Sequence, residues 1–89
     1  MRFINDTATG NGRLKNTRDS VMVIEFHARF DNTGYVYVGE SDVTTLKGRE
    51  IPAGESVTWN LGDGSILLNT IYAHIGTPGD KLDWTAFLR

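Results

Sequence analysis

Turn-forming residues recur at short intervals along this chain, and they limit every regular element to a short segment. Glycine, proline, asparagine and aspartate gather at residues 10–12, 31–34, 51–54, 62–64 and 76–80, and each of these residue types favours turns for a backbone reason. Between the clusters, apolar and polar residues alternate, which is the pattern of a strand with one buried face. No apolar repeat of helical period extends beyond one turn. The sequence therefore predicts an all-β fold, a small antiparallel β-sandwich or open barrel of five to seven strands.

Four segments show this alternation most clearly. The residues predicted to share one face are Met22, Ile24, Phe26, Ala28 and Phe30 in the first, Val57, Trp59 and Leu61 in the second, Ile71, Ala73 and Ile75 in the third, and Leu82, Trp84, Ala86 and Leu88 in the last. Residues 66–68 fit either the start of a strand or a helical turn that bridges two sheets. A core made of these aliphatic and aromatic faces is expected.

Residues 35–38, with the sequence Tyr-Val-Tyr-Val, form a further predicted strand because aromatic and β-branched residues favour strands. The preceding residues 31–34 suit a tight antiparallel hairpin to the strand at 21–30, with Gly34 taking a positive φ. If Val36 and Val38 face the core, then Tyr35 and Tyr37 lie either on an outer surface, as contact area for a partner, or at the rim of the core.

Residues 1–20 carry few large apolar side chains, and they are predicted to form a polar N-terminal arm or an edge strand, with the β-sandwich domain over residues 21–89. Such an arm orders on a neighbour when it cannot bury enough surface by itself. Arg13, Lys15 and Arg18 give the arm its positive charge. Together with Tyr35 and Tyr37, they are the candidate residues of a partner interface.

Length, charge and cysteine content exclude several classes. The 89 residues form one domain, hold no cysteine and carry a net charge of −2, so neither a disulfide nor a basic stripe for nucleic acid is expected. The sequence has no apolar run long enough to span a membrane and no leader-like N-terminus, so a soluble protein made in a cytoplasm is expected. Small domains without disulfides gain stability by self-association, which makes a homo-oligomer the expected state.

No arrangement of residues in the sequence predicts catalysis, cofactor binding or a metal site. His27 and His74 stand on separate predicted strands without a nucleophile motif. Glu40, Ser41 and Asp42 lack the alternate carboxylates and the distal acid of a calcium loop. The glycines at 62 and 64 are not followed by the Lys-Ser/Thr of a phosphate loop. The chain is therefore predicted not to be an enzyme.

A run of spaced motifs covers about residues 21–89. It reads Asn32-Thr33-Gly34-x-Val36-Tyr37-Val38-Gly39-x-Ser41-x-Val43, then Gly48, then Ile51-Pro52-Ala53-Gly54-Glu55-Ser56-Val57, then Ile71-Tyr72, and finally Gly79-Asp80-Lys81-Leu82-x-Trp84. This run resembles a group of small all-β virion proteins of tailed phages. The resemblance implies a non-enzymatic structural protein of the bacteriophage virion, most of all a capsid decoration (cement) protein that binds the outer head surface. It further implies a homotrimer, with the major capsid protein or another virion protein as partner.

Two other hypotheses remain at this stage. The protein could be a receptor- or carbohydrate-binding module, or an adaptor, of a head or tail fibre or neck, with Tyr35, Tyr37, Trp59 or Trp84 stacking on sugar rings. The predicted inward orientation of both tryptophans counts against this hypothesis. An enzyme would need His27 and His74 close together in one cleft.

Overall fold

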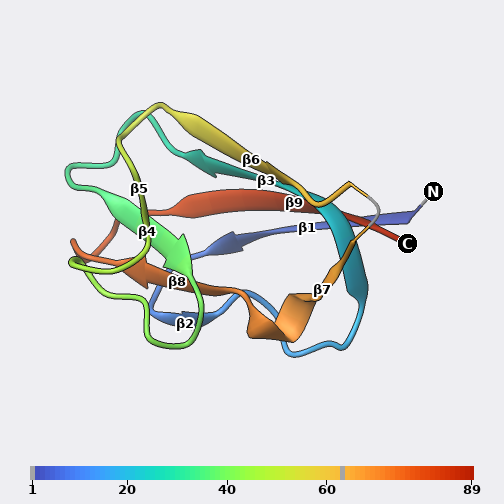
Figure 1. The fold of residues 1–89 in the computed structure, drawn as a ribbon. Coiled ribbons are helices and arrows are strands. Elements are labelled where there is room, and N and C mark those ends of the chain that lie inside the picture. The colour runs from blue at the N-terminus through green and yellow to red at the C-terminus, as the bar shows by residue number, and fades with distance from the viewer. Residues whose placement is uncertain (1, 63) are drawn as a thin grey trace.

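A computed structural model, which describes residues 2–62 and 64–89, shows a two-layered β-sandwich (Figure 1). The elements are β1 (Arg2–Ala8), β2 (Gly12–Arg13), β3 (Ser20–Ala28), β4 (Val36–Gly39), β5 (Arg49–Ile51), β6 (Ser56–Asn60), β7 (Ile66–Leu67), the 3₁₀ helix η1 (Leu68–Thr70), β8 (Tyr72–Ile75) and β9 (Leu82–Leu88). Every strand pair within the described residues is antiparallel. The predicted all-β antiparallel fold is confirmed, as two open sheets and not as a closed barrel.

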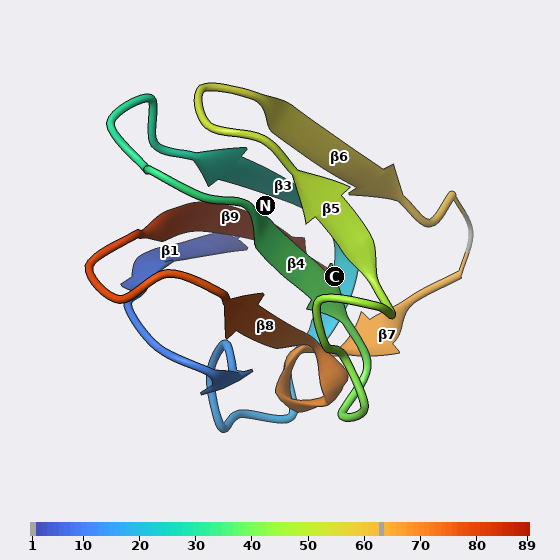
Figure 2. The same cartoon turned by 90° about the vertical axis from the view of Figure 1, so that its left-hand side faces the viewer.

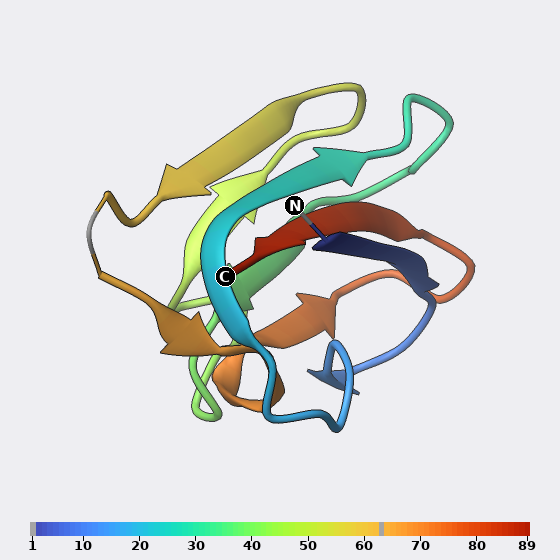
Figure 3. The same cartoon turned by 90° about the vertical axis from the view of Figure 1, so that its right-hand side faces the viewer.

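The two sheets differ in size and face each other across one core. The larger sheet has the order β1-β9-β3-β6, with β7 also paired to β3, and the smaller sheet has the order β2-β8-β4-β5. Figures 2 and 3 show the two layers from opposite ends of the sandwich. The chain crosses between sheets several times, for example from β3 to β4 and from β8 to β9. No helix among the described residues is long and apolar enough to cross a membrane.

The core consists of the inward faces of both sheets, and most of its members were predicted from alternation. Its buried residues are Val21, Ile24, Phe26, Ala28, Val36, Val38, Ile51, Leu68, Ile71, Ala73, Ile75, Leu82, Trp84, Ala86 and Leu88. Within β9 the burial alternates residue by residue, as a strand with one covered face requires. Trp59, on the outermost strand of the larger sheet, is only partly buried, and its ring meets Phe26 edge-on at 4.8 Å between centroids.

At the start of β3, the prediction of which side chains face the core is wrong. Val21 is fully buried and Met22 is only partly buried, the reverse of what simple alternation predicts. The cause is a register shift between Val21 and Val23 in the pairing of β3 with β9. A bulge of this kind adds one residue to the strand and turns the side chains before it to the other face.

The predicted hairpin between residues 21–30 and 35–38 is also wrong. β3 pairs with β6, β7 and β9, whereas β4 lies in the other sheet and pairs with β5 and β8. The strand ends at Ala28, so Phe30 lies beyond it and is 86% exposed. Gly34 does not adopt a positive φ. It is required for space instead, because a Cβ atom there would overlap the Thr77 hydroxyl.

The first twenty residues contribute an edge strand to each sheet. β1 pairs with β9 along its whole length, from Arg2 opposite Leu88 to Ala8 opposite Leu82. β2 pairs with β8 over only two residues, with Arg13 opposite Tyr72. This segment therefore spans both layers of the sandwich, and in Figure 1 the start of β1 and the end of β9 lie together at the end of the molecule that is away from the β8–β9 turn.

Candidate binding site

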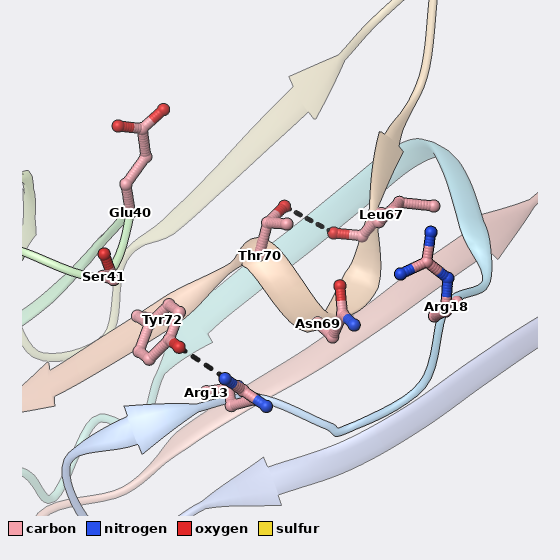
Figure 4. Close-up of a pocket in the computed structure, with 8 residues that line it drawn as sticks. All are labelled: Arg13, Arg18, Glu40, Ser41, Leu67, Asn69, Thr70 and Tyr72. Carbon is pink, nitrogen blue, oxygen red and sulfur yellow. Dashed lines mark hydrogen bonds between the residues drawn. The ribbon is translucent and has the colours of Figure 1, made fainter.

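An open pocket of about 480 Å³ lies where β2, the loop after β4 and the η1 helix meet. Its lining residues, drawn in Figure 4, are Arg13, Arg18, Glu40, Ser41, Leu67, Asn69, Thr70 and Tyr72. Two of the candidate interface residues named from the sequence, Arg13 and Arg18, are among them. Polar side chains dominate this lining, so the pocket suits a polar ligand group.

Arg13 is held in one orientation by the strand pairing and by its side-chain contacts. Because β2 places it opposite Tyr72, its Nε donates a hydrogen bond to the Tyr72 hydroxyl at 3.1 Å. Its Nη1 donates to Asn16 Oδ1 at 3.0 Å. The guanidinium carbon also lies 5.6 Å from the centre of the Tyr72 ring, within the range of a cation–π contact. An arginine fixed in this way loses little conformational entropy when it binds a ligand.

Arg18 is positioned by backbone hydrogen bonds on both sides of it. Asn69 N–H donates to the Thr17 carbonyl at 3.0 Å, and Leu68 N–H donates to the Asp19 carbonyl at 2.9 Å. These bonds hold the segment around Arg18 against η1, and in Figure 4 Asn69 is drawn between the two arginines. Leu68 is the buried residue of η1, so its side chain anchors this wall of the pocket in the core.

Neither arginine of the pocket forms an ion pair within the described residues. Among residues 2–62 and 64–89, the ion pairs are Arg2–Asp19, Arg29–Asp83 and Lys47–Asp42, and neither Arg13 nor Arg18 takes part in one. Glu40 is the one acidic residue of the lining. Guanidinium groups bind carboxylates and phosphates through paired, charge-assisted hydrogen bonds. The arrangement can therefore bind an anionic group.

The other candidate interface residues lie elsewhere. Lys15 does not line the pocket. Tyr35 is exposed just before β4, at the opposite end of that strand from Gly39, which pairs with Tyr72. Tyr37 is buried on the outward side of the smaller sheet, where burial and the nearby Glu50 raise its pKa above 10.0. The structure thus brings Arg13 and Arg18 together, and it does not join them to the two tyrosines.

The two histidines lie on different sheets. His27, on β3, has its Nδ1 2.8 Å from the Ser56 hydroxyl, and His74, on β8, lies beside the Tyr37 ring at 6.1 Å between centroids. In the described part of the chain, no three histidine or acidic side chains are grouped so that they could hold a metal ion. The glycine-flanked residue 63 of the rejected phosphate-loop motif lies outside the described residues.

Sequence reasoning missed the role of Asp80. This carboxylate is 4% exposed and accepts hydrogen bonds from Thr33 N–H at 2.9 Å and Gly34 N–H at 2.8 Å. Next to it, Asn32 exchanges two hydrogen bonds with the backbone of Lys81, at 2.8 and 2.9 Å. The Asn-Thr-Gly and Gly-Asp-Lys motifs are therefore one hydrogen-bonded unit, which we call the turn clasp (residues 32–34 with 80–81). An aspartate between turn residues and a buried strand was the signal available in the sequence.

The turn clasp has a structural role. It joins the connection from β3 to β4 with the connection from β8 to β9, both of which cross between the sheets. Hydrogen bonds from backbone N–H groups, first that of Thr33, lower the pKa of the Asp80 carboxyl below 3.8 although its burial acts in the opposite direction.

In comparisons with known proteins, no family model, no curated protein and no solved structure matches this chain.

Proposed function

We propose that the protein is a non-enzymatic structural protein of a tailed-phage virion, and specifically a capsid decoration protein that binds the outer head surface. The run of motifs from Asn32 to Trp84 supports the assignment to this group. Some of its members fall on the turn clasp and on buried strand positions such as Val36 and Leu82, and two others, Ser41 and Tyr72, line the pocket.

One observation carries the binding role: Arg13 and Arg18 line one pocket, and no carboxylate pairs with either of them among the described residues. We infer that the partner, the major capsid protein or another virion protein, places an acidic side chain or a chain terminus in this pocket. Charge-assisted hydrogen bonds of this type contribute about 1.5–3 kcal/mol each.

The experiment uses capsids of the encoding phage assembled without this protein. The purified chain is expected to co-sediment with these capsids and to raise the temperature at which they open. The variant Arg13→Glu/Arg18→Glu should bind at least tenfold more weakly, a change of about 1.4 kcal/mol. The control Arg49→Glu/Lys81→Glu changes the net charge equally at exposed residues outside the pocket, and it should bind as the unmodified chain does.

Two results distinguish a failure of the decoration role from a failure of the pocket as the contact surface. If the unmodified chain does not bind capsids at saturating concentration, the decoration role is wrong. If it binds and the Arg13→Glu/Arg18→Glu variant binds equally well, the role stands and the pocket is not the contact.

A carbohydrate-binding role is less well supported by the site. It would use an exposed indole as a platform for a sugar ring. Trp84 is buried in the core, and the Trp59 ring packs edge-on against Phe26. We therefore propose no second function.

A further inference from the structure

One edge of the larger sheet is formed by β1, a strand of seven residues, and the other by β6. β1 pairs with β9 on one side, and within the described residues no strand pairs with its other side. Every second residue of an antiparallel strand directs its N–H and C=O groups to the same side, so the backbone groups on the outer side of β1 are open to another strand. The strand contains no proline, no lysine and no bulge, and the charges that could block such pairing are those of Arg2 and Asp6. Unpaired charges disfavour an uncharged strand as a partner, so the edge selects a strand that carries complementary charges.

The charges of β1 are complementary to those of a second copy in one register. If two β1 strands pair antiparallel with Ile4 opposite Ile4, Arg2 of each copy lies opposite Asp6 of the other. Arg2, Ile4 and Asp6 share the inward face of the sheet, because they lie opposite the buried residues of β9. Opposite charges directly across an antiparallel pair are stabilising. A shift by two residues in either direction places Arg2 opposite Ile4 or opposite Ala8 and removes both ion pairs.

Neither charge has a strong competing partner in the same chain. The Arg2 side chain is 71% exposed, and its contact with Asp19 is long, at 3.5 Å between Nη2 and Oδ1. The Asp6 carboxylate accepts a hydrogen bond from the neighbouring Thr7 N–H at 2.8 Å, and Asp6 forms no ion pair within the described residues. Both groups can therefore reach across the sheet edge.

Phe3 supplies an apolar contact in the same register. Its side chain is 61% exposed on the outer face, beside the ring of Phe87 at 6.2 Å between centroids. With Ile4 opposite Ile4, Phe3 lies opposite Asn5 of the second copy, and the two Phe3 residues are diagonal neighbours. Diagonal neighbours lie about 7–8 Å apart, which aromatic side chains can bridge. The pairing would thus extend an apolar stripe from Phe87 of one copy to that of the other.

We propose that two copies of this chain associate by antiparallel pairing of their β1 strands about a two-fold axis at Ile4, joining the two larger sheets into one. The occupant of the edge is a second copy because the strand is complementary to itself in charge. This inference does not depend on the capsid role. It differs from the homotrimer that the family resemblance implies, so the stoichiometry distinguishes the two.

The first test measures mass in solution by sedimentation equilibrium over a range of concentrations. The unmodified chain should show a monomer–dimer equilibrium. Arg2→Asp and Asp6→Arg each place like charges across the axis, and each should raise the dimer dissociation constant at least tenfold. The combined variant Arg2→Asp/Asp6→Arg restores opposite charges and should return the constant to near its original value, whereas Arg49→Asp, outside β1, should leave it unchanged.

The second test fixes the register. The chain contains no cysteine, so Ile4→Cys introduces a single thiol at the proposed axis, and mild oxidation should link two chains rapidly. Phe30→Cys, at an exposed residue in a loop of the opposite end, should link much more slowly. A monomer at all concentrations, a trimer, charge reversals without effect, a combined variant without rescue, or equal rates of linkage would each overturn the proposal.

Discussion

Replacing Leu68 by alanine is expected to have two effects: it should destabilise the fold, and it should loosen the pocket lined by Arg13 and Arg18. The Leu68 side chain is 0% exposed and packs between the sheets, while the backbone on either side of it holds the segment around Arg18. A buried leucine changed to alanine costs about 2–5 kcal/mol, because apolar contacts are lost and a cavity remains. For 89 residues the total stability is about 4–13 kcal/mol. The substitution should therefore remove a large fraction of it.

The expected size can be measured by thermal and urea unfolding followed by tryptophan fluorescence. A domain of this length loses about 4–8 °C of Tm per kcal/mol, so a loss of about 3 kcal/mol corresponds to roughly 12–24 °C. Leu46→Ala is the matched control, since Leu46 is 96% exposed and should change the free energy of unfolding by less than about 0.5 kcal/mol. Leu68→Met keeps the volume and should cost less than about 1.5 kcal/mol. Equal stabilities of Leu68→Ala and Leu46→Ala would refute the packing described for η1.

Two further predictions concern the turn clasp. Gly34→Ala should lower the Tm because the new Cβ overlaps the Thr77 hydroxyl, and adding Thr77→Ala should recover part of the loss; Gly10→Ala, with open space around the Cβ position, should be neutral. If Gly34→Ala and Gly10→Ala melt alike, the close approach is absent. The Asp80 carboxyl has a pKa below 3.8 in the folded protein, so its contribution to stability is present above that pH and is lost as the pH falls through the folded pKa. Asp80→Asn should therefore lower the Tm at pH 7 and flatten its decline below about pH 4, and an unchanged acid slope would contradict this.

The strands with one covered face could be predicted from the sequence because burial repeats at every second residue. β9 is the clearest case, since Leu82, Trp84, Ala86 and Leu88 are all buried. The same rule fails where a local irregularity intervenes. The bulge in β3 reverses Val21 and Met22, and the end of that strand leaves Phe30 in solvent. Neither the bulge nor the end of the strand changes the apolar and polar composition of the segment, so the sequence pattern alone does not reveal them.

The connection at residues 31–34 was misread because its conformation is determined by a distant residue. Its composition is that of a hairpin turn, but Asp80, 47 residues after Thr33, binds its N–H groups and directs the chain into the other sheet. Whether Tyr37 is exposed or covered was likewise left open, because the groups beside it, His74 and Glu50, come from neighbouring strands. Contacts between residues far apart in sequence leave no local pattern.

The site was predictable only in part. Arg13 and Arg18 were identified as candidate interface residues by their charge in a polar segment. The pocket around them needs the two-residue pairing of β2 with β8 and the single turn of η1. Elements this short have no periodicity to detect.

The antiparallel pairing of β1 with β9 sets Arg2 opposite Leu88 at one end of these strands, and Ala8 opposite Leu82, next to the turn clasp, at the other end. The two ends of the sandwich therefore differ: one holds Arg2 and Leu88, and the other, the clasp pole, holds the turn clasp. A tag, a fluorophore or a surface linker attached at either chain terminus would emerge from the same place and present the clasp pole outward. Immobilisation through one terminus or the other should therefore give the same orientation on a sensor surface, with the clasp facing the solution.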